Sequence, residues 1–389
     1  MRQVGVCDIV ESTFRQLRLN SPDGGWFPVL HRLLWLITES NLRYIDLFLS
    51  PHLKEVTISP SPSWINSGVP HDIVPAIAST ISAFPASTLQ YLRVTYGVSW
   101  ADLTDSLSSV ALRCGPSLTE FASPIPLSSA AINHLIHLPH LHTWRLEGPP
   151  PSYSTLPLPQ TFPPLTELAL GRGTTRDWLS LFKRLEKRIP STWGVTPLSR
   201  IKESLKSLEF GDSPGFITNA SFTSTVRIFR NLTFLAMQID CHDENYNGRC
   251  PFKLDDDNVT KFAMALPQLE FLLLGSPCSE NTCATTVACL LPISVYCLEL
   301  GELEIHFNTT NIVDDLKNIP EDPQLQKLSS LPRCSLESLR VWRIPLDVDE
   351  ADLEAVVDGM INIFPTMDCL PAEDNSDWEG FSERMAEIY

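Results

Sequence analysis

The stretch LPQLEFLLLGSP at residues 266–277 contains an apolar hexad, in which Leu269 and Leu272 are separated by two variable residues and Leu272 and Leu274 by one. The alternation in its second half has the period of a β-strand, whose side chains point in turn to opposite faces. The hexad recurs along most of the chain. Clear copies begin at Leu42, Leu53, Leu89, Leu141, Leu165, Leu205, Leu232, Leu269, Leu300 and Leu336, and a weaker copy begins at Leu118.

Several segments between the hexads have the period of helices, and polar residues suited to capping stand at some of their starts: Asp72, Ser128, Thr174 and Asp349. The expected helices cover residues 72–84, 100–114, 128–138, 174–189, 256–266 and 350–364. A repeated strand and helix predicts an α/β fold, an irregular leucine-rich-repeat solenoid with a parallel inner sheet and outer helices.

The spacing of the copies leaves an alternative open. Their starts lie 11 to 40 residues apart, whereas the usual repeat is roughly 20–29 residues long. A doubly wound α/β fold also alternates strands and helices. Its buried strands would, however, be continuous apolar runs without the hexad frame, and the solenoid is therefore the favoured prediction.

Four phrases carry a resemblance to a known family: NLRYIDLFLSPHLKEVTI at 41–58, LPQLEFLLLGSP at 266–277, CLELGELEIHFNTT at 297–310 and LESLRVWRIP at 336–345. Together and in this order, they resemble the fungal F-box proteins with divergent leucine-rich repeats. The resemblance implies a protein-interaction module that recognises substrates for a cullin ubiquitin ligase. In that family, an F-box upstream of the repeats binds the Skp-type adaptor.

Residues 1–40 do not show the Leu-Pro opening of an F-box. We expect a helix over 29–38, where Leu30, Leu33, Leu34 and Ile37 recur at helical spacing, to close the open end of the solenoid. Binding of the Skp-type adaptor by this chain is therefore not expected. The predicted organisation is an N-terminal helical cap at 1–40, the solenoid at 41–370 and an acidic C-terminal tail at 371–389.

Composition and charge limit the partners. The formal net charge is −17, from 46 acidic and 29 basic residues, and such a field repels phosphate backbones, so nucleic acid is not an expected partner. No apolar run of membrane-spanning length occurs, so no membrane partner is expected either. The ten cysteines follow no disulfide pattern, and the first 20 residues do not resemble a signal peptide. These features predict a cytoplasmic or nuclear protein.

No familiar catalytic motif is present, and the prediction is a non-enzymatic protein with no catalytic residues and no cofactor. The spacing of Cys241, His242, Cys250, Cys278 and Cys283 matches no zinc motif, and no metal site is predicted. The acidic run Asp255–Asp257 is interpreted as a helix cap, and the cluster of His134, His137, His140 and His142 as a loop edge. An enzyme on an α/β fold with dispersed catalytic residues remains the alternative.

The variable positions of each hexad point away from the apolar ones, onto the concave inner face of the sheet. Exposed aromatic and charged residues in neighbouring repeats are typical of a protein-binding surface. We therefore expect an unknown protein partner on the concave face. The candidate binding residues are Tyr91, Arg93, Arg145, Glu167, Glu209, Phe234, Phe271, Leu273, Glu304 and Arg340.

Overall fold

A computed structural model of the chain forms two compact units, one up to residue 171 and one from residue 204 onward among the residues that it describes. The described residues are 3–6, 11–20, 26–61, 64, 73–95, 103–146, 163–171, 204–210, 229–238, 254–275, 284–319, 321, 323–341, 346, 348–367, 381 and 384. The expected helix over 174–189 and nearly all of the predicted tail at 371–389 lie outside them.

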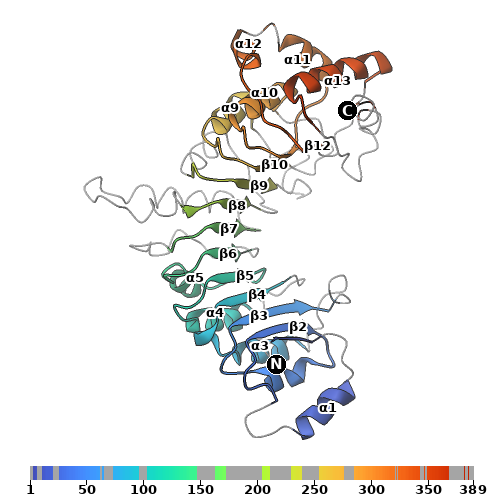
Figure 1. Cartoon of the computed structure of the whole chain (residues 1–389). Helices are drawn as coiled ribbons and strands as arrows, with labels where there is room; N and C mark the ends of the chain where they lie inside the picture. Colours follow the sequence, from blue (N-terminus) through green and yellow to red (C-terminus); the bar gives the residue numbers. More distant parts are fainter. Residues whose placement is uncertain are drawn as a thin grey trace, which may run out of the picture. The chain divides into compact units, whose positions relative to one another are not determined.

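The first unit contains strands that pair in chain order, each parallel to the next (Figure 1). They are β1 (Gln3–Val6), β2 (Arg32–Ile37), β3 (Glu55–Pro60), β4 (Tyr91–Val94), β5 (Glu120–Ser123), β6 (Thr143–Leu146) and β7 (Glu167–Leu170). Each strand from β3 onward coincides with the second half of a predicted hexad. The weaker copy at Leu118 is confirmed as a strand by β5.

The second unit repeats this arrangement, again with parallel strands in chain order. Its strands are β8 (Ser207–Phe210), β9 (Phe234–Gln238), β10 (Phe271–Gly275), β11 (Glu302–Ile305) and β12 (Ser338–Val341). A doubly wound sheet reverses its strand order at a switch point, whereas the order within each unit follows the sequence without reversal. The fold is therefore the predicted α/β leucine-rich-repeat type of solenoid.

The register keeps equivalent hexad positions side by side despite the uneven intervals. In the second unit, Leu272 of β10 is paired with Leu235 of β9 and with Leu303 of β11. All three side chains are fully buried, and so is Leu269, which ends the turn before β10. The extra residues of long repeats therefore lie in the connections, because the sheet accepts one common strand register.

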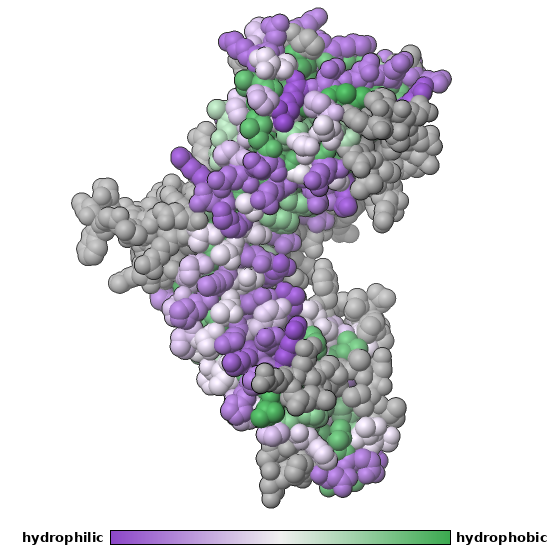
Figure 2. Space-filling model, viewed as in Figure 1, coloured by the Kyte–Doolittle hydropathy of each residue, from purple (hydrophilic) through white to green (hydrophobic). Residues whose placement is uncertain are grey.

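Helices in the connections supply the other side of the core. The first unit has α1 (Glu11–Leu19), α3 (Val74–Ser82), α4 (Thr104–Arg113) and α5 (Ser129–Leu135), and α4 contacts both α3 and α5. The second unit has α9 (Asp256–Ala263), α10 (Leu290–Tyr296), α11 (Ile312–Asn318), α12 (Pro323–Ser329) and α13 (Glu350–Ile363). Hydrophilic residues predominate on the visible surface of α12 and α13 in Figure 2.

Capping explains where three of these helices begin. The side chains of Ser128, Asp255 and Asp349 each accept a hydrogen bond from a backbone N–H in the first turn of the helix that follows. The capping roles predicted for Ser128, Asp349 and the acidic run at Asp255 are thus confirmed. The N-cap of α3 is Ile73, without a side-chain bond, while Asp72 and Thr174 lie outside the described residues.

Two predicted elements near the N-terminus are wrong. Residues 29–38 do not form a helix, because Arg32–Ile37 is strand β2, in which Leu33, Trp35 and Ile37 are buried in alternation. The spacing of apolar residues in this segment fits both periods, and pairing with β1 and β3 decides for the strand.

The first hexad, Leu42 to Leu47, is not a strand either. Leu42–Phe48 forms the 3-10 helix η1, in which Leu42 and Ile45 lie one turn apart and are both buried. The buried Asn41 directs the chain into this helix. Its amide donates to the carbonyl oxygen of Leu36 at 2.7 Å, and its Oδ1 accepts from the N–H of Thr38 at 3.0 Å.

Candidate functional site

The candidate binding surface is formed by the first and third residues of each strand, which point away from the core. We call this surface the outward face of each unit. The hexad residues beside these positions are buried, whereas most outward side chains are half-buried or exposed. The exceptions are the small residues Ala122, Ala169 and Ala236, which are buried. The predicted alternation of the ten candidate residues is therefore present in the structure, while their role in binding stays a prediction.

Ion pairs between strands dominate the outward face of the first unit. Arg93 of β4 donates to the carboxylate of Glu120 on β5 at 2.9 Å. Arg145 of β6 pairs with Glu167 of β7. The guanidinium group of Arg93 also lies 5.4 Å from the centre of the Tyr91 ring. Four of the predicted residues, Tyr91, Arg93, Arg145 and Glu167, are thus held by their own neighbours.

A third pair, which sequence reasoning missed, joins Arg32 of β2 to Glu55 of β3 at 3.2 Å. Arg32 was missed because its segment was assigned to a helix, and Glu120 because its hexad is the weakest copy.

The pKa of Tyr91 depends on its burial and on the neighbouring charges of Glu120 and Arg93. Burial raises the pKa of Tyr91 above its ordinary value and the charge of Glu120 raises it further, while Arg93 opposes them.

Aromatic stacking takes the place of ion pairs in the middle of the second unit. The rings of Phe234 on β9 and Phe271 on β10 are stacked, with 4.4 Å between their centres and 6° between their planes. Leu273 of β10 lies opposite Ala236 of β9 in the same pair of strands. The structure therefore brings Phe234, Phe271 and Leu273 together as one apolar patch.

Acidic residues border this patch on both sides. Glu209 of β8 is paired in register with Ala236, and Glu302 and Glu304 of β11 are paired with Phe271 and Leu273. Arg340 of β12 donates to the carboxylate of Glu304 at 2.9 Å. Among the described residues, neither Glu209 nor Glu302 takes part in an ion pair.

The two outward faces consequently differ in charge. Among the described strands, the first unit presents three arginines and three glutamates, all of them paired. The second unit presents three glutamates and one arginine. The first face is electrically balanced, and the second is acidic around an aromatic centre.

His134 and His137 of the predicted histidine cluster contact backbone carbonyl groups, and the free cysteines among the described residues are buried. His134 Nε2 lies 2.9 Å from the carbonyl oxygen of Cys114, and His137 Nδ1 lies 2.6 Å from that of Asn133. Burial raises the pKa of the Cys114, Cys297 and Cys334 thiols to about 12, so these thiols stay protonated near neutral pH.

No group of three or more His, Cys, Asp or Glu residues in the described ranges is placed to hold a metal ion. The five residues weighed for zinc, Cys241, His242, Cys250, Cys278 and Cys283, lie outside those ranges. Within the same part of the chain, the helices are all too short or too polar to span a bilayer.

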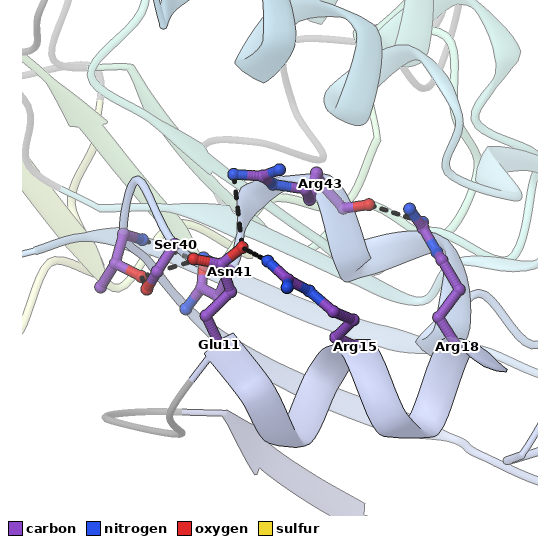
Figure 3. Close-up of polar contacts among 7 residues, drawn as sticks. Glu11, Arg15, Arg18, Ser40, Asn41 and Arg43 are labelled. Carbon is purple, nitrogen blue, oxygen red and sulfur yellow. Dashed lines mark hydrogen bonds and ion pairs between the residues drawn. The ribbon is translucent and has the colours of Figure 1, made fainter. Parts of the chain in front are cut away.

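A polar cluster fixes α1 against η1 at the beginning of the first unit. Arg15 and Arg43 both reach the carboxylate of Glu11, at 3.2 and 3.6 Å, and Arg18 donates to the carbonyl oxygen of Arg43 at 2.6 Å (Figure 3). The fully buried Phe14 of α1 also stacks on Tyr44 of η1, with 5.3 Å between ring centres. Glu11, Phe14 and Arg18 of α1 are therefore already in contact with residues of η1.

Comparisons with known proteins leave the family open. No family model matches the chain, and no curated protein matches it in sequence. One of the solved structures that it resembles is the crystal structure of a TLR13–ssRNA13 complex, with 12% sequence identity and a TM-score of 0.36. The likeness covers 95% of this chain and 48% of that chain, so this chain spans about half of its length. The fold class itself rests on the strand order and register described above.

Proposed function

We propose that the chain is a non-catalytic protein-interaction module that binds a partner protein on the outward face of its sheet. The observation that carries this proposal is the pair of stacked aromatic rings, Phe234 and Phe271, on a sheet face whose remaining outward residues are mostly charged or polar. Aromatic side chains with a polar rim are characteristic of protein–protein interfaces. Parallel strands in a common register hold such residues in fixed rows, which lowers the entropy lost on binding.

The finer proposal is that the module recognises substrates as F-box receptors of ubiquitin ligases do, in the cytoplasm or nucleus. It is supported by the likeness of the hexad phrases to fungal F-box proteins with leucine-rich repeats. Binding of the Skp-type adaptor is not part of the proposal. Residues 11–48 contribute α1, β2 and η1 to the first unit, and the apolar side chains of Phe14 and Trp35 are used in its core.

Site-specific photo-crosslinking in cells tests the proposed function. A photoreactive phenylalanine analogue is placed at Tyr91 on the first outward face, at Phe271 on the second, and at two control positions. The controls are Leu112 in α4 and Met264 at the end of α9, which are 45% and 57% exposed and lie on the helical side. Protein crosslinks from an outward position and none from the controls are the expected result. Crosslinks from the controls alone would contradict the proposal.

A further inference from the structure

The outward face of the second unit contains two rows of side chains, which the strand register defines. The first row is Ser207, Phe234, Phe271, Glu302 and Ser338, and the second row is Glu209, Ala236, Leu273, Glu304 and Arg340. Neighbours within a row are about 4.8 Å apart, so each row of five extends for about 19 Å. Four apolar residues, Phe234, Ala236, Phe271 and Leu273, lie between acidic residues of β8 and β11, and we call them the apolar square.

The stacked rings leave their outer faces turned along the first row. Their planes are parallel within 6°, and the distance of 4.4 Å between their centres is close to the strand spacing. The outer face of Phe234 is therefore directed toward Ser207 and that of Phe271 toward Glu302. Serine is small and leaves room beside the ring, and a carboxylate beside a ring face favours a positive charge at that place.

Two of the three acidic charges around the square are not balanced by residues that the structure describes. Glu304 is neutralised by Arg340 at 2.9 Å, but Glu209 and Glu302 have no ion-pair partner among the described residues. These two glutamates lie three strands apart, about 14 Å across the strands, and in different rows, about 7 Å along them, so about 16 Å separates them. In an extended peptide, this distance corresponds to about five residues. A segment with two basic residues at that separation and apolar residues between them matches the surface.

We propose that the outward face of the second unit binds a basic segment of a partner protein, in which two Lys or Arg residues pair with Glu209 and Glu302 and flank apolar residues that cover Leu273 and the Phe234–Phe271 stack. This inference rests on the proposed function and names the chemistry of the partner. The basic group that pairs with Glu302 also lies over the outer face of the Phe271 ring, where a cation is attracted by the aromatic quadrupole. The balanced outward face of the first unit offers no comparable charge.

Selection from a displayed library of random peptides of about ten residues, long enough to cross the five strands, tests the inference on the full chain. Selected peptides are remeasured against the Glu209→Gln/Glu302→Gln double variant and against Phe234→Ser. The matched control is Glu354→Gln, which removes an exposed charge from α13 on the helical side of the same unit. A second control, Arg145→Gln, alters the outward face of the first unit. Thermal melts of all variants verify folding.

Peptides rich in Lys and Arg are the expected outcome, with basic residues about five positions apart. Their dissociation constants rise about tenfold in the double glutamate variant and stay within about twofold in Glu354→Gln. Neutral or acidic peptides that depend on Phe234, or peptides that depend on Arg145, would overturn the inference and leave the proposed function standing. Peptides that depend on neither outward face would overturn both.

A second copy of this chain is the remaining occupant, and light scattering of the free protein tests for it. A monomer whose mass is the same in the wild type and in Phe271→Ser is expected. Two copies would bring like charges together at Glu209 and Glu302, which is unfavourable. A dimer that Phe271→Ser dissociates would overturn the inference, because the surface would then be a self-association site.

Discussion

Replacing either of two adjacent leucines in β10 tests the assignment of the two faces of the sheet. Leu272 is fully buried between Leu235 and Leu303, and the next residue, Leu273, is half-buried on the outward face. Leu272→Ala should lower the free energy of unfolding by about 2–5 kcal/mol, because it removes core contacts and leaves a cavity. Leu273→Ala should lower it by about 1 kcal/mol or less, because much of that side chain is already in contact with water.

Urea unfolding followed by circular dichroism measures the two losses under the same conditions. Neighbouring repeats stabilise one another, so the effect of a substitution extends beyond its own strand. Hydrogen exchange is therefore better suited than urea unfolding to identify the strands that lose stability. In Leu272→Ala, the backbone amides of β9, β10 and β11 should exchange faster than in the wild type. Leu208→Ala, at the equivalent buried position of β8, serves as a second core variant with an expected loss of the same order.

The pair of variants is informative because a strand has a period of two. A register shifted by one residue would exchange the buried and outward residues of the whole strand. Equal losses for Leu272→Ala and Leu273→Ala, or a larger loss for Leu273→Ala, would refute the assignment of the outward face. The binding proposals, which depend on that face, would then fail as well.

Three further perturbations have defined outcomes. Phe14→Ala should cost about 3–5 kcal/mol in the region of α1, seen as faster hydrogen exchange there, whereas Leu19→Ala, at a side chain 74% exposed, should change stability by less than about 0.5 kcal/mol. Burial raises the pKa of Asp256 above its ordinary 3.8, so its contribution to stability is present below pH 3.8 and is lost as pH rises through the raised value. Asp256→Asn should therefore reduce the fall of the urea-derived free energy of unfolding as pH rises above 3.8, and an unchanged fall would contradict this. Deletion of residues 1–40 removes β1 and β2 and bares the edge of β3, so it should cause aggregation detectable by light scattering.

The sequence predicts the sheet well because packing leaves little choice at the hexad positions. Leu235, Leu272 and Leu303 must meet in one register, and each side chain fills a place that two neighbouring repeats share. An apolar residue of similar size is required at each such place, so the pattern is visible in a single sequence. The starts of capped helices are visible for a related reason, since Ser128 and Asp349 satisfy backbone N–H groups that no helical partner reaches.

The first residues were harder to predict because a short apolar run has no period of its own. Leu30, Leu33, Leu34 and Ile37 fit one side of a helix, and Leu33 and Ile37 equally fit one side of a strand. Pairing of residues 32–37 with the strands on both sides decides between them. Local spacing does not reveal a partner strand elsewhere in the chain, so the sequence of this segment predicts a helix where the structure has a strand.

The candidate site was predictable as a set of positions but not as a set of interactions. The alternation identifies Arg93 and Arg145 as outward residues, but it does not say which glutamate each one meets. Arg93 pairs diagonally with Glu120, two residues from its register partner Ala122, and this depends on the reach of a long side chain. The stack of Phe234 on Phe271 was more accessible, because both rings occupy the same place in consecutive hexads.

Stability alone does not explain why the two outward faces differ. In the first unit, the side chains of Arg93 and Glu120 are 36% and 19% exposed, and a pair of this kind contributes about 0.2–1 kcal/mol. The stack of Phe234 and Phe271 contributes about 0.5–1.5 kcal/mol beyond the area it buries, a gain of the same order. The fold is therefore compatible with either an ion pair or an aromatic stack at the outward positions. The choice between ion pairs and stacked rings does change the exposed surface. Paired charges of opposite sign give the first unit a balanced polar face, whereas stacked rings beside Glu209 and Glu302 give the second unit an apolar, acidic face. The difference between the faces is thus not required for folding, and it is what the proposed binding of a partner on the second face would need.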